Sequence, residues 1–257
     1  MKGEMRLPKR RVLTADISVG SFATHIAAFL DLARERRSSY VCCVNAHMTV
    51  EALEPGFAQV VNGADMATAD GMPVLKALRF FHRVDQERVA GNDILPALLE
   101  GAEAQGLSVY FYGGQQAVLD TMVARAAREY PRLRIAGTHS PPFRPLSAEE
   151  MDAIAAMIDA SGAHIVMVSL GCPKQERWMA DMKGRVHGLM LGLGGAFLLY
   201  AGVDKRAPKW MRDLSLEWTY RLWLEPGRLW KRYLSTNSTF LCLFVKEWIR
   251  GGRRRVK

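Results

Sequence analysis

Polar side chains follow the apolar runs of this 257-residue sequence, at the points where buried strands would end. Asn45 comes directly after one such run, and Asp70 and Gln175 come shortly after two others. A carboxylate can accept a proton from a hydroxyl group, and side-chain amides can hold a sugar or an attacking nucleophile by hydrogen bonds. Because parallel strands end at one edge of a sheet, we expect these three side chains to share a crevice there.

Each of these residues also has a purely structural interpretation. Asp70 lies between a strand and a helix. Judged without other information, an aspartate at such a position is more often a helix N-cap than a base. Asn45 suits an Asx turn or a cap equally well. Glu176, next to Gln175, needs no role beyond favouring the dipole at the start of its helix.

Glycines and basic residues could supply the anion-binding part of such a crevice. Glycine lets a backbone approach a ligand, and helix N-termini favour phosphates. The glycines concerned are Gly113, Gly114, Gly192, Gly194 and Gly195. Arg88 and Lys174 precede or begin expected helices and could bind diphosphate oxygens, although a surface position is the alternative. Phe197 stands where a dinucleotide fingerprint needs its third glycine, so the sequence does not support that motif.

The basic charge lies mainly at the C-terminal end. Residues 205–257 contain fourteen Lys and Arg against four Asp and Glu, and five of the six tryptophans. Tryptophan and arginine at helical spacing are typical of a helix that lies on an anionic membrane surface. A solvated basic helix with its tryptophans packed on a core is the alternative. Arg206, Arg221 and Arg228 are candidate phosphate ligands, either in the crevice or on lipid.

Composition excludes several other classes of protein. Four cysteines without metal-ligand spacing indicate reduced thiols in the cytoplasm rather than a disulfide framework or a zinc site. No apolar run is long enough to cross a membrane. Basic ends around a mildly acidic middle argue against a nucleic-acid-binding protein. The sequence lacks the Asp-x-Asp pair that commonly holds a divalent metal in sugar transferases, so we expect no metal or other cofactor.

Strand-like and helix-like patterns alternate along most of the chain. This alternation predicts an α/β fold with a Rossmann-like, mostly parallel sheet covered by helices on both faces. We expect a catalytic core at 1–203 and a helical appendage of two or three helices at 204–257. The expected strands are 12–17, 40–44, 64–68, 108–112, 132–139, 164–170 and 188–193. The expected helices are 21–36, 47–53, 72–81, 93–105, 115–130, 147–161 and 174–182, with a capping box at Ser147 and Glu150.

The order of motifs resembles the WecG/TagA/CpsF family of glycosyltransferases (glycosyltransferase family 26), over about residues 12–240. The motifs are a strand-end Asn45, ADGMP at 69–73, RVAGND at 88–93, GCPKQE at 171–176 and LEW at 216–218. ADGMP and LEW are most similar to the exopolysaccharide and capsule members. One position departs from the family pattern, because Leu198 follows Phe197 where the family usually has aspartate, a nucleotide contact.

The resemblance implies a function and a place of action. Asp70 would be the general base of an inverting transfer from a UDP-sugar to a polyprenyl-diphosphate-linked glycan. Asn45 and Gln175 would contact the sugar or the acceptor, and the appendage would bind the anionic cytoplasmic face of the bacterial inner membrane. Members are also associated with homo-oligomers. Two other readings stay open from the residues alone: a different nucleotide-binding enzyme such as a dehydrogenase, and a non-catalytic membrane adaptor.

Overall fold

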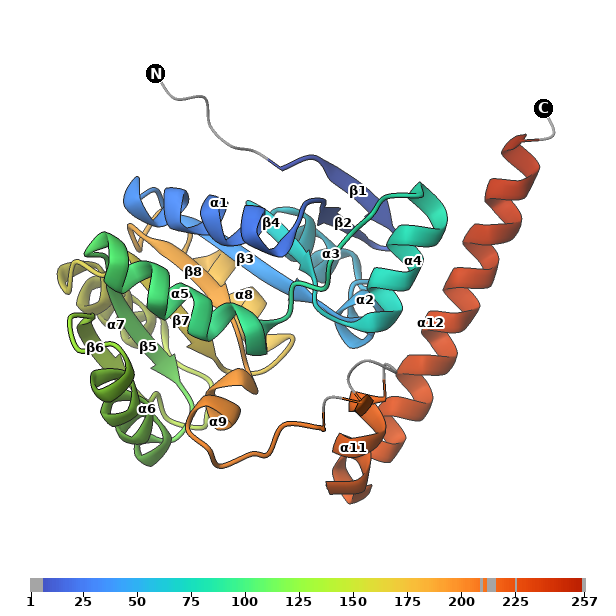
Figure 1. Ribbon diagram of the computed structural model, residues 1–257. Helices are drawn as coiled ribbons and strands as arrows, with labels where there is room; N and C mark the ends of the chain where they lie inside the picture. Colours follow the sequence, from blue (N-terminus) through green and yellow to red (C-terminus); the bar gives the residue numbers. More distant parts are fainter. Residues whose placement is uncertain (1–6, 209, 212–215, 225, 256–257) are drawn as a thin grey trace.

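A computed structural model describes residues 7–208, 210–211, 216–224 and 226–255. Its centre is a six-stranded parallel sheet in the order β4-β3-β8-β7-β5-β6, and a separate antiparallel hairpin is formed by β1 and β2 (Figure 1). The strands are β1 Lys9–Val12, β2 Ala15–Ser18, β3 Ser39–Val44, β4 Met66–Ala69, β5 Ser108–Gly113, β6 Arg134–His139, β7 Ile165–Ser169 and β8 Leu189–Gly192. The predicted Rossmann-like fold class is therefore confirmed.

Helices cover both faces of this sheet. One apolar cluster joins the sheet to α1 Phe22–Arg34, α5 Gly91–Gln105, α6 Gln116–Glu129 and α9 Ala196–Tyr200. The other joins it to α2 Ala46–Glu51, α3 Pro55–Asn62, α4 Met72–His82, α7 Ala148–Ala160 and α8 Lys174–Met182. The appendage contributes α11 Glu217–Leu224 and α12 Pro226–Arg255.

The strands are apolar on both sides because both sides are covered. In β3, Tyr40, Cys42 and Val44 face one cluster, whereas Val41 and Cys43 face the other. This alternation follows from the two-residue period of a strand. It explains why the sequence shows short, continuous apolar runs here instead of alternating polar and apolar residues.

Local signals in the sequence set many element boundaries. The side chain of Ser21 caps α1, and the capping box of Ser147 and Glu150 begins α7, as predicted. The helix predicted at 174–182 has the bounds of α8. Two short helices, α3 and α9, were not predicted, because each is too short to show a helical period.

The prediction of a single strand at 12–17 was wrong. The segment contains the end of β1, a turn at 13–14 and most of β2, and Leu13 adopts a positive φ of 55° in the turn. Tertiary hydrogen bonds hold this turn: Thr14 Oγ1 donates to the carbonyl of Thr49 at 2.7 Å, and Asn62 Nδ2 donates to the carbonyl of Thr14 at 3.0 Å. Partners this distant in sequence leave no local signal of a turn.

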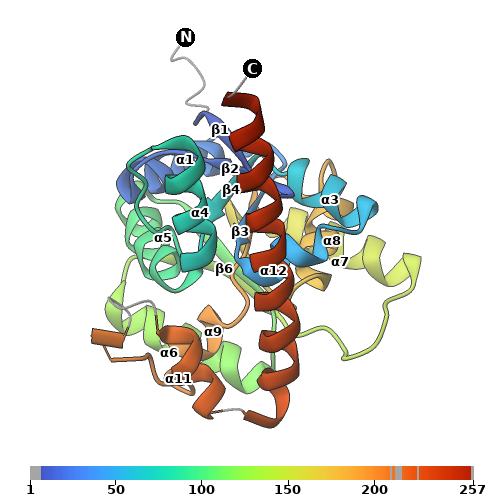
Figure 2. The same cartoon turned by 90° about the vertical axis from the view of Figure 1, so that its right-hand side faces the viewer.

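The appendage packs on the core along α12, which runs beside α4 and α2 in both views (Figures 1 and 2). The ring of Phe244 lies 5.2 Å from that of Phe80 and 4.9 Å from that of Phe81, measured between centroids. Phe240 is buried in the same apolar cluster as the sheet. The division into units at 1–203 and 204–257 stays a prediction, and this packing shows how α12 is attached to the core.

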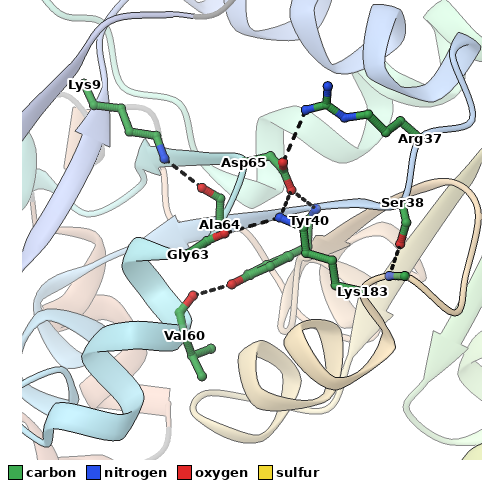
Figure 3. A network of polar contacts seen from close by, with 10 residues as sticks. Lys9, Arg37, Ser38, Tyr40, Val60, Gly63, Ala64, Asp65 and Lys183 are labelled. Atoms are coloured by element: carbon green, nitrogen blue, oxygen red, sulfur yellow. Dashed lines mark hydrogen bonds and ion pairs between the residues drawn. The ribbon is translucent and has the colours of Figure 1, made fainter.

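A network of polar contacts lies at the amino-terminal ends of β3 and β4, at the edge of the sheet opposite the expected crevice (Figure 3). Asp65 Oδ2 accepts a hydrogen bond from the backbone N–H of Tyr40 at 3.0 Å and pairs with Lys183 at 2.9 Å. Arg37 lies 3.6 Å from the other carboxylate oxygen. The Tyr40 hydroxyl donates to the carbonyl of Val60 at 2.5 Å, which ties β3 to α3.

We predict that Asp65→Asn lowers the free energy of unfolding by about 1–3 kcal/mol, because a partly buried carboxylate loses its charge-assisted partners. The control is Asp16→Asn. Asp16 pairs with Arg11 at 3.0 Å on the surface, and such exposed pairs contribute about 1 kcal/mol or less. Urea unfolding of both variants measures the difference. Equal losses would show that Asp65 acts as an ordinary surface charge.

Candidate active site

The predicted site residues lie in a row at the carboxyl ends of neighbouring strands. Asp70 follows β4, Asn45 follows β3, and Gly194 lies two residues after β8. The strand pairing aligns them, because Val44 lies opposite Ala69 and Cys42 lies opposite Gly192. A Cβ placed on Gly71 would lie 3.0 Å from the Cβ of Asn45, so the two strand ends are in close contact.

Asp70 does not cap the helix that follows it. The N-cap of α4 is Gly71, and no side chain caps that helix. Asp70 is partly buried, and its Oδ1 instead accepts a long hydrogen bond, 3.3 Å, from the backbone N–H of Gly91. Gly91 in turn packs on Leu193, whose carbonyl oxygen lies 3.4 Å from the place of a Cβ on Gly91. The first turn of α5 therefore joins Asp70 to the glycine-rich end of β8.

Asn45 has the structural role that was the alternative at the sequence level. It is the N-cap of α2, and its Oδ1 accepts from the backbone N–H of Met48 at 3.1 Å. This bond fixes the carboxamide at the crevice edge beside Gly71. The cap leaves the amide NH₂ of Asn45 as the part of the side chain that can serve a ligand.

The glycines after β8 make room for Gln175. A Cβ on Gly192 would lie 2.8 Å from Nε2 of Gln175, and one on Gly194 would lie 3.4 Å from its Oε1. Gly195 is the N-cap of α9. These glycines therefore admit a protein side chain, and any ligand at this corner would lie against Gln175 as well as against the backbone.

The two glycines after β5 differ in what surrounds them. Gly113 has a φ of 98°, and a Cβ there would lie 2.4 Å from the carbonyl oxygen of Ser169, so only glycine fits. Gly114 has a φ of 76° and nothing within 4 Å of the place of a Cβ. Gly114 is the one of the pair that leaves open space for a ligand.

Gln175 is held by two neighbours at the start of α8. Its Oε1 accepts from the backbone N–H of Gly171 at 3.3 Å, and its Nε2 donates to Oε1 of Glu176 at 2.8 Å. Glu176 is completely buried, and burial raises the pKa of its carboxyl against the opposing effect of the hydrogen bond from Gln175. Glu176 is thus a buried acid in the first turn of α8, where the helix-dipole role considered for it applies but does not account for its burial.

An open cavity of about 390 Å³ adjoins Asp70 between α4, α5 and the appendage. Arg88 connects the two, because its Nε donates to the carbonyl of Asp70 at 2.8 Å and its Nη2 pairs with Glu217 at 2.8 Å. Arg206 lines the same cavity and pairs with Asp93. The lining residues are Met72, Leu75, Arg79, Glu87, Arg88, Asp93 and Arg206. Three arginines on one cavity make it suitable for phosphate groups.

The other predicted phosphate ligands are placed less centrally. Lys174 is exposed on the first turn of α8. The backbones of Arg221 and Arg228 belong to α11 and α12, and their side chains lie outside the described residues. The N-cap of α5 is Ala90, and Asp93 in its first turn pairs with Arg206.

Sequence reasoning missed several groups at this site. Arg79 looks like a surface residue of a helix, yet its Nε and Nη2 both donate to the carbonyl of Gln86 on the cavity wall, at 3.0 and 2.5 Å. Glu217 was noticed only as part of a motif, although it pairs with Arg88. Nothing in the sequence connects the LEW motif at 216–218 with RVAGND at 88–93, because their contact depends on the tertiary fold.

Two searches bear on metal and membrane binding. Within residues 7–208 and the described parts of the appendage, no three His, Cys, Asp or Glu side chains gather as a metal site would require. None of the described helices combines the length and the apolar character needed to cross a bilayer. None of the tryptophans of the appendage is buried in the core, since all five side chains are exposed: Trp210, Trp218, Trp223, Trp230 and Trp248.

Comparison with known proteins gives the family. The model of the glycosyl transferase WecG/TagA/CpsF family matches residues 10–254. The chain belongs to this family. It is also 32% identical over 223 residues to the N-acetylglucosaminyldiphosphoundecaprenol N-acetyl-beta-D-mannosaminyltransferase of Bacillus spizizenii, covering 86% of this chain and 83% of that protein.

Membership of the WecG/TagA/CpsF family makes the chain a glycosyltransferase, as the resemblance indicated. The dehydrogenase and adaptor readings are therefore set aside. Leu198, where this chain departs from the family pattern, has a partly exposed side chain on α9. Nothing in its packing requires leucine there.

We predict that Glu176 contributes a fall in the free energy of unfolding as the pH rises above about 4.5, and that Glu176→Gln removes this contribution. Glutamate in the unfolded chain ionises near its ordinary pKa of 4.5, whereas the folded chain holds the Glu176 proton to higher pH. Ionisation therefore favours the unfolded chain from pH 4.5 up to the folded pKa. Burial raises the pKa of the neighbouring Cys42 thiol well above 9, so that thiol stays neutral throughout.

Urea unfolding between pH 4 and pH 8 measures this effect. The stability advantage of Glu176→Gln over the wild type should grow with pH. Glu149→Gln is the control, because the hydrogen bond from Ser147 lowers the pKa of the exposed Glu149 carboxyl, so that its effect on stability changes only below about pH 4.5 and its difference from the wild type should stay constant above that pH. A difference between Glu176→Gln and wild type that does not change with pH would contradict the prediction.

Proposed function

We propose that this protein transfers a hexose or N-acetylhexosamine from a UDP-sugar to a polyprenyl-diphosphate-linked sugar, with inversion at the anomeric carbon. The relative from Bacillus spizizenii is named for transfer of N-acetylmannosamine to such a lipid-linked acceptor. The observation that carries the proposal is Asp70, a partly buried carboxylate at a strand end, whose backbone carbonyl accepts a hydrogen bond from Arg88 on the wall of a cavity lined by three arginines.

The proposed reaction is a single displacement. The Asp70 carboxylate accepts the proton of the acceptor hydroxyl, the hydroxyl oxygen attacks the anomeric carbon, and the bond to the diphosphate breaks. UDP leaves with the bonding electrons, so its diphosphate gains negative charge. Arg88 and Arg206 lie where they could stabilise that charge without a metal ion.

The position of Asp70 supports its role as base. Its carboxylate follows the end of β4, and its Oδ1 accepts from the backbone N–H of Gly91 at 3.3 Å instead of capping α4. Asn45, directly after β3, and Gln175, on the first turn of α8 after β7, would contact the sugar or the acceptor. Gly114 would leave room for the ligand beside β5.

We also propose that the appendage binds the anionic cytoplasmic face of the inner membrane, where a lipid-linked acceptor resides. Its tryptophans are exposed, and Trp223 is 77% exposed. Basic residues are interleaved with them along the sequence. Exposed tryptophan with basic residues on one helical segment is the composition of an interfacial helix. Assembly in exopolysaccharide or capsule synthesis, and association into homo-oligomers, are part of the same proposal.

We predict that Asp70→Asn lowers kcat at least about 100-fold, since loss of a general base typically costs 10²–10⁴ in rate. Asn keeps the size of the side chain and an acceptor for the Gly91 N–H, so the UDP dissociation constant should stay near that of the wild type. The assay is UDP release from a panel of UDP-sugars, in EDTA, with and without a polyprenyl-diphosphate-linked sugar. Substantial activity in Asp70→Asn would remove Asp70 from the role of base.

The same panel tests the function as a whole. Acceptor-dependent release from one donor supports the transferase and identifies its sugar. Release that requires added Mg²⁺ or Mn²⁺ would contradict the metal-independent mechanism. A folded wild-type protein that releases no UDP with any pair of substrates would contradict the proposed donor and acceptor.

We predict that Trp223→Ala combined with Trp230→Ala reduces binding to anionic phospholipid vesicles at least about tenfold, because two exposed aromatic side chains no longer enter the interface. Co-sedimentation with vesicles measures the binding. The matched control is Phe143→Ala, which removes a side chain that is 85% exposed on the loop before α7. Equal binding by both variants would show that the appendage is not the membrane-binding surface.

A further inference from the structure

Glu176 is a completely buried carboxyl next to the proposed site residue Gln175. Its Oε1 accepts the hydrogen bond from Gln175 at 2.8 Å, its Oε2 meets no donor in ordinary hydrogen-bond geometry, and a hydrogen bond from the Cys172 side chain lowers the pKa of the carboxyl only in part against its burial. Burying a carboxyl with an unpaired oxygen costs stability. Since an apolar side chain would fill this volume at lower cost, packing alone does not account for a glutamate here.

The orientation of the Gln175 amide depends on this carboxyl and on one backbone group. The Oε1 of Gln175 accepts from the N–H of Gly171, and its Nε2 donates to Glu176. A flipped amide would set its NH₂ against the Gly171 N–H, where two donors would face each other. The two neighbours therefore select the same one of the two possible orientations.

The glycines beside Gln175 confine the amide but do not orient it. Gly192 and Gly194 lie against Nε2 and Oε1, at 2.8 and 3.4 Å from the places of their absent Cβ atoms. Neither glycine has a side chain that could form a hydrogen bond with the amide. Orientation is thus left to Gly171 and Glu176, and these two hydrogen bonds leave over one N–H of Nε2 and one lone pair of Oε1 on a side chain that is 5% exposed.

We infer that Glu176 is a positioning residue for the transfer reaction, which fixes the Gln175 carboxamide so that its remaining N–H and lone pair face the substrate in one orientation. Glu176 is buried beneath Gln175 and acts only through it. The inference rests on the proposed transferase function and on the role proposed there for Gln175.

The test is a double-mutant cycle with Gln175→Ala, Glu176→Met and the double variant, with Glu176→Gln as the conservative control. Methionine keeps the length of the side chain but accepts no comparable hydrogen bond. We expect Glu176→Met to lower kcat about tenfold or more, the factor for a buried amide that loses its acceptor. The UDP dissociation constant should change little, since UDP lacks the sugar.

Two further results are expected from the cycle. Glu176→Gln should recover most of the kcat, because its Oε1 can accept the same hydrogen bond. Glu176→Met should add nothing to the loss in Gln175→Ala, because the amide that it positions is already gone. Losses that multiply, or a Glu176→Gln variant as slow as Glu176→Met, would overturn the positioning role.

A second readout does not require turnover. Exchange of the Gln175 side-chain amide protons with solvent, followed by NMR, should be slow in the wild type and in Glu176→Gln and fast in Glu176→Met. Equal exchange in all three would overturn the inference even if the enzyme is active. A wild type without transfer activity would instead contradict the proposed function alone, while the exchange rates still test how the amide is held.

Discussion

The pairing of β3 with β4 on one side and β8 on the other is the constraint on which the site depends. It aligns residues that are far apart in sequence, since Val44 lies opposite Ala69 and Cys42 lies opposite Gly192. A shift of one residue in either pairing would turn alternate side chains to the other face of the sheet and displace the strand ends. Side chains on both faces pack into apolar clusters, so a shift would disrupt the packing on both faces at once. The register is therefore strongly specified.

The same edge combines rigid and electrostatic elements. Gly113, Gly192 and Gly194 bring backbone and side chains into contact at distances that a Cβ would prevent or crowd. Arg88 and Arg206 instead connect the core to the appendage through carboxylate partners. The part of the site that is packed around glycines lies at the ends of β5, β7 and β8. The part that contains the arginines lies near α4 and α5.

Local patterns predicted much of the fold but less of the site. Ser21, Ser147 and the helix at 174–182 could be recognised because a cap or a helical period involves neighbouring residues. The position of Asp70 at a strand end could be predicted for the same reason. The contact between Arg88 and Glu217, and the burial of Glu176, could not, because both depend on tertiary packing that brings distant segments together.

The Arg88–Glu217 ion pair has a thermodynamic consequence. One guanidinium N–H group cannot donate fully to a carboxylate and to a phosphate at once, so an anion that takes this donor competes with the appendage for it. The competition is reciprocal. Anion binding at Arg88 weakens the Arg88–Glu217 pair by a certain factor, and breaking that pair strengthens anion binding by the same factor. The occupancy of one donor would thereby couple the position of a surface helix to the state of the crevice.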